Sequence, residues 1–268
     1  MSKPLAPADA ARIAFQAFGV HMEVGVTPAS ELERLRLQLP PGWEPTDSSM
    51  VRKRFEIVPD VRGGDLFALV RDGQPFVDHV SLDLALTLVE AQVRAYVALH
   101  APDSIFVHAG AVGHHGRAIV IPGMSFAGKT TLVAALVRAG ATYLSDEFAP
   151  LDEHGLVHPY AKPLSVRDRH MVQHDHDVAS IGGSAGLHPL PIGLVVATAY
   201  SPGGRWQPQR LSRGRALMAL LSHTVAAQTR PQQVMSFLTK SVAGAVLLES
   251  PRGDAGALAP LLLAELEG

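Results

Sequence analysis

The chain contains one complete phosphate-binding loop motif, which restricts its fold and chemistry more than any other feature. Residues 123–130 read GMSFAGKT and match the pattern G-x-x-x-x-G-K-[ST] at every fixed position. The apolar run AIVI precedes the motif, and the helical pattern TLVAALVRAG follows it. This strand–loop–helix order lets backbone N–H groups surround an anion at the positive end of a helix. The sequence therefore predicts an α/β protein with a polyphosphate site; the alternative is a glycine-rich turn without a ligand.

The residue types in this loop are those that bind Mg²⁺·ATP. Gly123 and Gly128 allow the backbone to wrap tightly around phosphate groups. The Lys129 ammonium neutralises the β- and γ-phosphates, and the Thr130 hydroxyl is placed to hold Mg²⁺. The predicted nucleotide-binding residues are Gly123, Ser125, Ala127, Gly128, Lys129, Thr130 and Thr131.

Two adjacent carboxylates, Asp146 and Glu147, follow the short apolar segment 141–144. A P-loop protein that transfers phosphate needs an acid at a strand end, because an acid holds Mg²⁺ or activates the attacking group. Most P-loop families place this acid much farther along the chain, whereas here it comes directly after the predicted helix. The later apolar segment 193–199 ends without a carboxylate. We therefore expect Asp146 and Glu147 to provide the acid that phosphate transfer needs. The alternative is that they form a solvated turn after a strand.

A longer pattern surrounds the loop motif. His108, within HAGAV, lies fifteen residues before Gly123, and Asp146 lies twenty-three residues after it. An Arg-Ala-Gly triplet at 138–140 ends the predicted helix. These spacings resemble those of the HPr kinase/phosphorylase family, in which a His-Gly strand precedes the loop and an Arg-Gly pair and two acids follow it.

The downstream residues resemble the HPr-kinase-related branch of that family. The S-D-E-F segment at 145–148 has Glu in place of the second Asp, and the proline-rich segment 159–167 ends in Ser-Val-Arg. The resemblance covers residues 105–170. The C-terminal signature with which HPr kinases grip HPr is not evident in this chain.

The resemblance implies a fold and a division of roles. The fold would be a mixed twisted sheet with flanking helices, built on a P-loop kinase core of the HPr kinase and phosphoenolpyruvate carboxykinase type. One of Asp146 and Glu147 would accept the proton of the acceptor hydroxyl, and the other would help to hold Mg²⁺. The expected metal ligands are Thr130 and Glu147. The sequence leaves open which carboxylate is the base.

Other side chains are candidates for supporting roles. The resemblance implies that His108 lies beside the acid pair, where it would tune the base or touch the γ-phosphate. Lys162 and Arg167 are candidates for cations that would stabilise the negative charge that develops on the transferred phosphoryl group. The alternatives are a buried strand histidine and ordinary surface residues. His170 and His174 would share a face if their segment were helical and could then bind a metal; a polar surface segment is the alternative.

These features predict an ATP-dependent kinase that transfers the γ-phosphate to a hydroxyl, with ATP and Mg²⁺ as cofactors. The expected acceptor is a serine of a peptide or protein, because the related families phosphorylate such residues. A small-molecule kinase on the same core is one alternative. A nucleotide-binding regulator without catalysis is another, although a regulator could dispense with His108 and the acid pair, which this chain has.

We predict a small N-terminal α/β domain over residues 1–100 and the catalytic domain over residues 101–268. In the first domain, Ser81 is expected to cap a helix that reaches residue 99, and Thr27-Pro28 to open a helix that reaches residue 39. The other predicted strands lie within 10–26 and at 55–58, 66–70, 105–112, 118–121, 141–144, 194–199 and 242–249. The other predicted helices lie at 131–138, 214–221, 232–238 and 257–265.

Composition and charge exclude several classes of protein and site. Lys plus Arg number 23 and Asp plus Glu 25, so the formal net charge of −2 gives no electrostatic footprint for nucleic acid. The absence of cysteine excludes disulfides, thiolate metal sites and a Cys nucleophile. The uncharged stretch 178–204 contains prolines and glycines that a membrane helix would not tolerate, and the N-terminus has no apolar signal core. We expect a cytoplasmic protein without a membrane or nucleic-acid partner; a homo-oligomer is left open.

Overall fold

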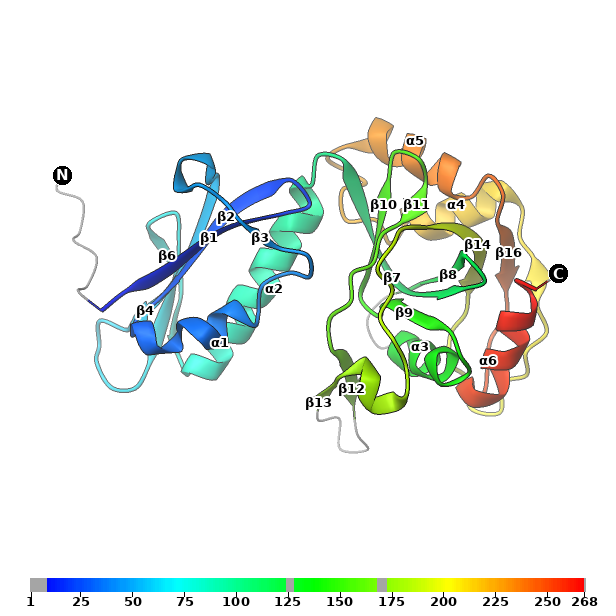
Figure 1. The fold of residues 1–268 in the computed structure, drawn as a ribbon, viewed down its shortest axis with the longest axis horizontal. Helices are drawn as coiled ribbons and strands as arrows, with labels where there is room; N and C mark the ends of the chain where they lie inside the picture. Colours follow the sequence, from blue (N-terminus) through cyan, green and yellow to red (C-terminus); the bar gives the residue numbers. More distant parts are fainter. Residues whose placement is uncertain (1–8, 124–127, 168–172, 268) are drawn as a thin grey trace. The chain divides into compact units, whose positions relative to one another are not determined.

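The computed structural model describes residues 9–123, 128–167 and 173–267, and it describes only the backbone at 165–167 and 173–175. The chain divides into two compact units, Met1–Pro102 and Asp103–Gly268 (Figure 1). Each unit has its own sheet and its own helices, and each is described by itself. No helix in the described ranges is both long enough and apolar enough to cross a membrane.

The first unit is built on a six-stranded sheet. Its strand order is β3 (Glu44–Pro45), β1 (Ala11–Ala17), β2 (Val20–Val26), β4 (Lys53–Pro59), β5 (Phe67–Arg71) and β6 (Gln74–Val80). Only β2 and β4 run parallel; the other neighbouring strands are antiparallel. Asp72 and Gly73 both have positive φ angles, as the tight hairpin turn between β5 and β6 requires.

Helix α2 (Leu82–His100) lies along one face of this sheet and packs against β4 and β5 (Figure 1). The predicted cap is confirmed, because Ser81 Oγ accepts a hydrogen bond from the N–H of Leu84 at 3.4 Å. The predicted buried face is confirmed as well, since Leu86, Val89 and Val93 recur at spacings of three and four and are buried.

The predicted helix start at Thr27 is wrong. The N–H of Thr27 donates to the carbonyl of Ile57 at 2.9 Å, so this residue continues the pairing between β2 and β4. Pro28 follows in an extended conformation after a cis peptide bond. Helical structure begins only with the 3-10 turn η1 (Ala29–Glu31) and continues in α1 (Leu32–Arg36). The residue that precedes the helical turn is therefore Pro28, and no side chain caps the turn.

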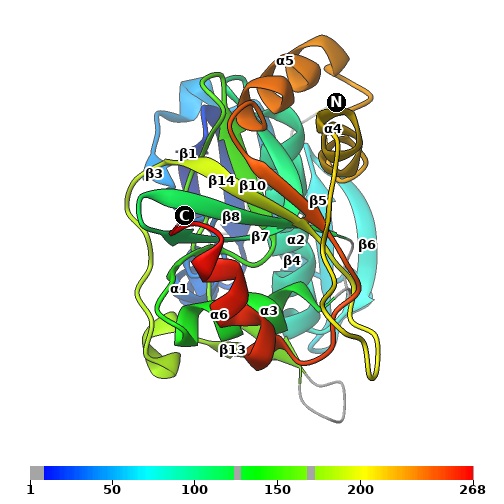
Figure 2. The ribbon, with the colours of Figure 1, turned by 90° about the vertical axis from the view of Figure 1, so that its right-hand side faces the viewer.

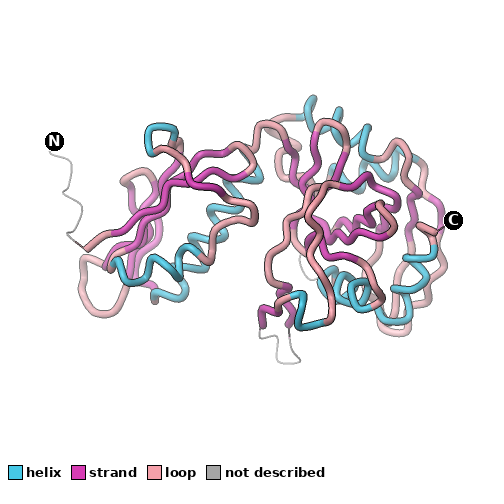
Figure 3. The backbone as a smooth tube through the Cα atoms, in the orientation of Figure 1, coloured by secondary structure: helices cyan, strands magenta, loops and turns pink. Residues whose placement is uncertain are grey.

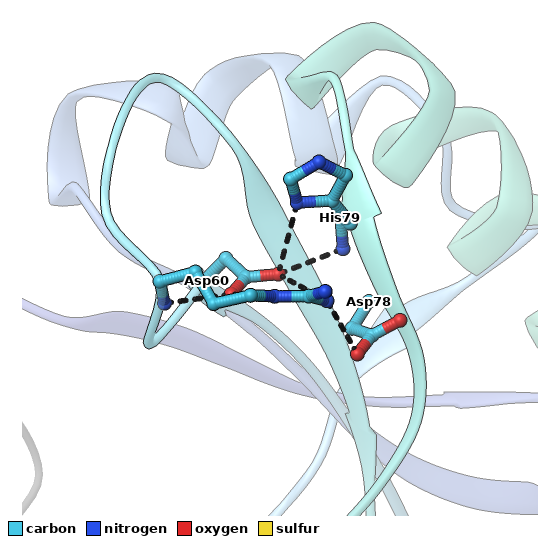
Figure 4. Close-up of polar contacts among 4 residues, drawn as sticks. Asp60, Asp78 and His79 are labelled. Atoms are coloured by element: carbon cyan, nitrogen blue, oxygen red, sulfur yellow. Dashed lines mark hydrogen bonds and ion pairs between the residues drawn. The ribbon is translucent and has the colours of Figure 1, made fainter.

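A buried carboxylate, Asp60, holds the turn after β4 together (Figure 4). It accepts hydrogen bonds from the backbone N–H groups of Arg62 and His79, each at 2.8 Å. The Arg62 guanidinium lies 3.3 Å from Asp60 and 2.7 Å from Asp78. The hydrogen bonds from Arg62 lower the pKa of Asp60, with His79 adding to the effect. All of these partners lie within the turn or on β6, so Asp60 stabilises the first unit.

The second unit is built on an eight-stranded mixed sheet. Its order is β11 (Leu156–Val157), β10 (Phe148–Asp152), β7 (Ser104–His114), β8 (Arg117–Pro122), β14 (Leu190–Ala197), β16 (Val246–Glu249) and β15 (Gln209–Arg210), with β9 (Thr142–Ser145) paired to β7. Strand β14 runs parallel to β8 and to β16. Because β11 pairs with both β10 and β14, the strands β7, β8, β14, β11 and β10 form a closed ring.

Two pairs of helices cover the two faces of this sheet (Figures 2 and 3). Helix α3 (Lys129–Arg138) contacts α6 (Ala255–Ala264), and α4 (Arg213–Leu221) contacts α5 (Pro231–Ser241). Alternate residues of β8 point into the two cores: Val120 packs in the α4 and α5 core, whereas Ile119 packs in the α3 and α6 core. Both units combine helices and mixed strands, so the predicted mixed α/β class is confirmed.

Several local predictions for the second unit differ from the structure. Strand β10, which no sequence pattern indicated, carries Pro150 and pairs with the first half of β7. The strand expected at 242–249 begins only at Val246, because α5 extends through Ser241. His174 lies on β13 (Gln173–His176), which pairs with β12 (Leu164–Arg167) as a strand, so the helical alternative considered for this segment does not hold at His174. His170 lies outside the described residues. The 3-10 turn η3 (Val178–Ile181) follows this hairpin.

Candidate functional site

The glycine-rich segment connects β8 to α3. Gly123 is buried directly after β8, and its N–H donates to the carbonyl of His108 at 3.1 Å. Gly128 is the N-cap of α3 and has a φ angle of +78°, in the left-handed region that favours glycine. A side chain at this position would also lie 2.5 Å from Nη2 of Arg252. The expected contributions of Ser125 and Ala127 lie outside the described residues.

Lys129 and Thr131 belong to the first turn of α3. The Lys129 ammonium donates to the carbonyl of Gly123 at 2.8 Å, so its side chain reaches back across the segment. Burial lowers the pKa of Lys129, and the charges of Asp146 and Glu147 raise it. The ammonium and the two carboxylates are therefore close enough to influence one another. Thr131 is exposed on α3.

Asp146 connects the first turn of α3 to the end of β9. Its Oδ2 accepts a hydrogen bond from the Thr130 hydroxyl at 2.9 Å, and its Oδ1 accepts one from the Tyr143 hydroxyl at 3.0 Å. Burial and the neighbouring carboxylate raise the pKa of Tyr143, so this hydroxyl stays a donor. Thr130 and Asp146, sixteen residues apart, thus meet directly.

Glu147 lies beside Asp146 and is more exposed. The Ser145 hydroxyl accepts the N–H groups of Glu147 and Phe148 at 3.2 and 3.1 Å, which fixes the turn that presents both acids. Nζ of Lys162 lies 3.5 Å from Oε2 of Glu147 and 3.9 Å from Oδ1 of Asp146. Lys162 is thereby placed at the acid pair. The side chain of Arg167, which was expected at the site, is not among those described.

His108 lies on β7, opposite Phe148 of β10. Its ring is 4.5 Å from the Phe148 ring, centroid to centroid, and its neighbour Ala109 donates through N–H to the carbonyl of Glu147 at 3.1 Å. Burial lowers the pKa of His108; Glu147 opposes this effect, whereas Lys129 adds to it. The histidine, the lysine and the acid therefore share one electrostatic environment.

A second histidine, His223, follows α4 and was not singled out from the sequence. Its carbonyl accepts the N–H of His108 at 2.8 Å, and burial together with Lys129 lowers its pKa. Its Nδ1 is buried without a hydrogen-bond partner. His223 follows His108 by 115 residues, outside any motif, so no sequence signal could have found it.

Arg252 is a second residue that the sequence pattern did not reveal. It lies after β16 and is 2% exposed, and its Nη2 donates to the carbonyl of Gly128 at 2.8 Å. Thr130 thus contacts the acid pair, and a buried guanidinium lies against Gly128. The described residues form a site with basic groups, hydroxyls and two carboxylates around a glycine-rich turn, which is a suitable set for an anionic ligand and proton transfer.

Comparisons with known proteins include a distant structural similarity. Among solved structures, this chain is similar to the HPr(Ser) kinase/phosphatase from Coxiella burnetii, with a TM-score of 0.34 and 12% sequence identity. The match covers 60% of this chain and 93% of that structure. No protein-family model matches the chain, and no curated protein does.

Proposed function

We propose that this protein is an ATP-dependent kinase that transfers the γ-phosphate of ATP to a hydroxyl group. The hydrogen bond between Thr130 and Asp146 carries the proposal, because it joins the helix that follows the G-x-x-x-x-G-K-[ST] motif to the acid pair. A phosphate-binding loop and a carboxylate in direct contact are the two parts that a P-loop phosphotransferase requires. The core would be a P-loop kinase core of the HPr kinase and phosphoenolpyruvate carboxykinase type.

The residues at this contact suit a magnesium ion. Mg²⁺ prefers oxygen ligands, and the Thr130 hydroxyl and the Asp146 carboxylate provide them within 2.9 Å of each other. When bound, Mg²⁺ would neutralise negative charge on the phosphate groups. Thr130 and Asp146 would hold it, directly or through water. This proposal gives the metal-binding role to Asp146 in place of Glu147, which was the expected ligand.

Glu147 is then the carboxylate that would accept the proton. It is the more exposed of the two acids, with 28% of its side chain accessible against 2% for Asp146. As the acceptor oxygen bonds to the γ-phosphorus, its proton passes to Glu147 and the bond from that phosphorus to the β–γ bridging oxygen breaks, which releases ADP. Lys129 and Lys162 would offset the negative charge during transfer.

The acceptor we propose is a serine of a peptide or protein in the cytoplasm. Support comes from the resemblance of residues 105–170 to a family that phosphorylates serine. The first unit carries no catalytic motif and would help to select the acceptor. A small-molecule kinase on the same core is the second candidate, and a nucleotide-binding regulator that transfers no phosphate is the third.

The test is phosphate transfer from γ-labelled ATP with Mg²⁺, in the presence of lysate from the protein's own cells and with products separated by size. We expect label in a polypeptide, and we expect Lys129→Ala to abolish the labelling because Lys129 is the cation at the loop. The matched control is Lys240→Ala, which removes an exposed lysine of α5. Label only in small metabolites would support the second candidate, and equal transfer by Lys129→Ala would contradict the loop assignment.

A further inference from the structure

An exposed aromatic ring lies beside the last glycine of the loop. Tyr200 is 59% exposed, and it is the only aromatic residue among the large exposed apolar side chains of the described ranges. Its Cβ lies 3.7 Å from the place that a Cβ would take at Gly128. Gly128 is the residue at which α3 begins. The ring is thus next to the turn where polyphosphate binding is proposed.

The buried Arg252 lies behind this ring. Its Cζ is over the Tyr200 ring, 5.7 Å from the centroid, and its Nη1 and Nη2 donate to the carbonyls of Gly253 and Gly128. Its Nε is buried without a hydrogen-bond partner. No carboxylate of the described residues comes within 4.0 Å of this guanidinium. The charge of Asp254 acts on the guanidinium from a longer distance, and an anion bound nearby would stabilise the buried charge further.

Backbone hydrogen bonds hold the tyrosine and the arginine together. The N–H of Arg252 donates to the carbonyl of Ala199 at 3.0 Å, and the N–H of Ser201 donates to the carbonyl of Arg252 at 2.8 Å. Tyr200 and Arg252 pair as a parallel bridge between these bonds. The backbone under the exposed ring is therefore fixed, so only the side-chain torsions of Tyr200 have to be ordered when a planar ligand stacks on the ring.

We propose that Tyr200 and Arg252 form the nucleoside end of the nucleotide site. The face of the Tyr200 ring opposite Arg252 stacks on the base, and Arg252 supplies a fixed positive charge to the phosphates beside Gly128. This inference rests on the proposed function, in which the segment 123–130 binds Mg²⁺·ATP. Stacking accepts any base, so the site favours nucleoside triphosphates over inorganic polyphosphate rather than one base over another.

The experiment measures the dissociation constants of Mg²⁺·ATP and of inorganic tripolyphosphate with Mg²⁺ for the full chain and its variants. We expect Tyr200→Ala to weaken ATP binding by about ten-fold and to leave tripolyphosphate binding unchanged, because only the nucleotide has a base to stack. Tyr200→Phe keeps the ring and should keep the affinity for ATP. Arg252→Gln should weaken both ligands. The matched control is Met218→Ala on α4, which removes another side chain that is 59% exposed.

The outcomes separate this inference from the proposed function. A full-length wild-type protein that binds neither ligand would contradict the proposed function. Wild-type binding together with unchanged ATP affinity in Tyr200→Ala, or an equal loss for both ligands in that variant, would overturn the stacking site alone. Because Arg252 is buried, its variant is compared only if circular dichroism shows a native fold. The exposed Tyr200 variants decide the proposal by themselves.

Discussion

Among the described residues, each unit has one buried aspartate, and the two are bound by different kinds of group. Asp60 and Asp146 are both 5% exposed. Asp60 accepts backbone N–H groups and one guanidinium from its own turn and from β6. Asp146 accepts the side-chain hydroxyls of Thr130 and Tyr143 instead. Backbone N–H groups thus contribute to the binding of Asp60, whereas Asp146 accepts side-chain hydroxyls, of which that of Thr130 can rotate away.

This difference separates a structural carboxylate from one that can serve a ligand. Backbone N–H donors cannot leave Asp60 without opening the turn. A hydroxyl such as that of Thr130 can turn toward a metal ion or phosphate while Asp146 does the same, because rotation about one bond suffices. Burial alone therefore does not indicate function; the chemical nature of the hydrogen-bond donors does.

Removing the charge from the acids of the second unit should have the largest effect on activity. We expect Asp146→Asn and Glu147→Gln each to reduce phosphate transfer by at least ~100-fold, because a carboxamide neither accepts a proton nor binds Mg²⁺ well. Both variants should still bind nucleotide, as fluorescence titration would measure. Asp60→Asn is the control from the first unit and should transfer phosphate at the wild-type rate per folded molecule. Full activity in both acid variants would show that Asp146, like Asp60, has only a structural role.

His108 should matter less than either acid. We expect His108→Ala to reduce transfer by about ten-fold, below the range typical of a general base. Because burial lowers the pKa of His108 from its ordinary value near 6.5, the ring is uncharged at pH 7. The wild-type rate should therefore stay level between pH 7 and 8 and fall only in more acidic solution. A loss in His108→Ala larger than that in Glu147→Gln would make the histidine the base.

Substitutions at two glycines of the second unit test how closely α3 packs on β7. On β7, a Cβ at Gly110 would lie 2.6 Å from Cγ2 of Val133 on α3. We expect Gly110→Ala to lower the free energy of unfolding by about 1–3 kcal/mol, measured by urea denaturation, because α3 must shift. In Gly214→Ala on α4 the new methyl group meets no atom within 4 Å, so this control should be neutral or slightly stabilising. Equal stabilities of the two variants would contradict close packing of α3 on β7.

Acidification should distinguish the structural carboxylate by its effect on stability. The lowered pKa of Asp60 means that its ionised form stabilises the fold above pH ~4, and that this contribution is lost as the pH falls through the folded-state pKa. We expect Asp60→Asn to have a lower Tm than wild type at pH 7, with the difference shrinking between pH 5 and pH 3. A difference in Tm that stays constant over this range would show that the charge of Asp60 contributes nothing.

Local patterns were sufficient for much of the fold. The spacing of Leu86, Val89 and Val93 and the cap at Ser81 located α2 to within a residue, because helix periodicity and capping act over a few positions. Strand β10 escaped prediction, since its few residues include Pro150 and it is stabilised by pairing with a distant strand. The predicted helix start at Thr27 was wrong for a similar reason. The backbone hydrogen bond from Thr27 to Ile57 is a long-range contact that no local sequence pattern indicates.

The residues of the candidate site also fall into two groups: those that a local motif identifies and those that only the tertiary structure identifies. Residues 123–130 and the pair Asp146–Glu147 could be recognised because they are local motifs, defined by residue type at fixed spacing. The contacts of His223 with His108 and of Arg252 with Gly128 depend on how strands and helices more than a hundred residues apart pack together. Packing depends on the shape and burial of the whole core, so the spacing of residues along the chain does not indicate it.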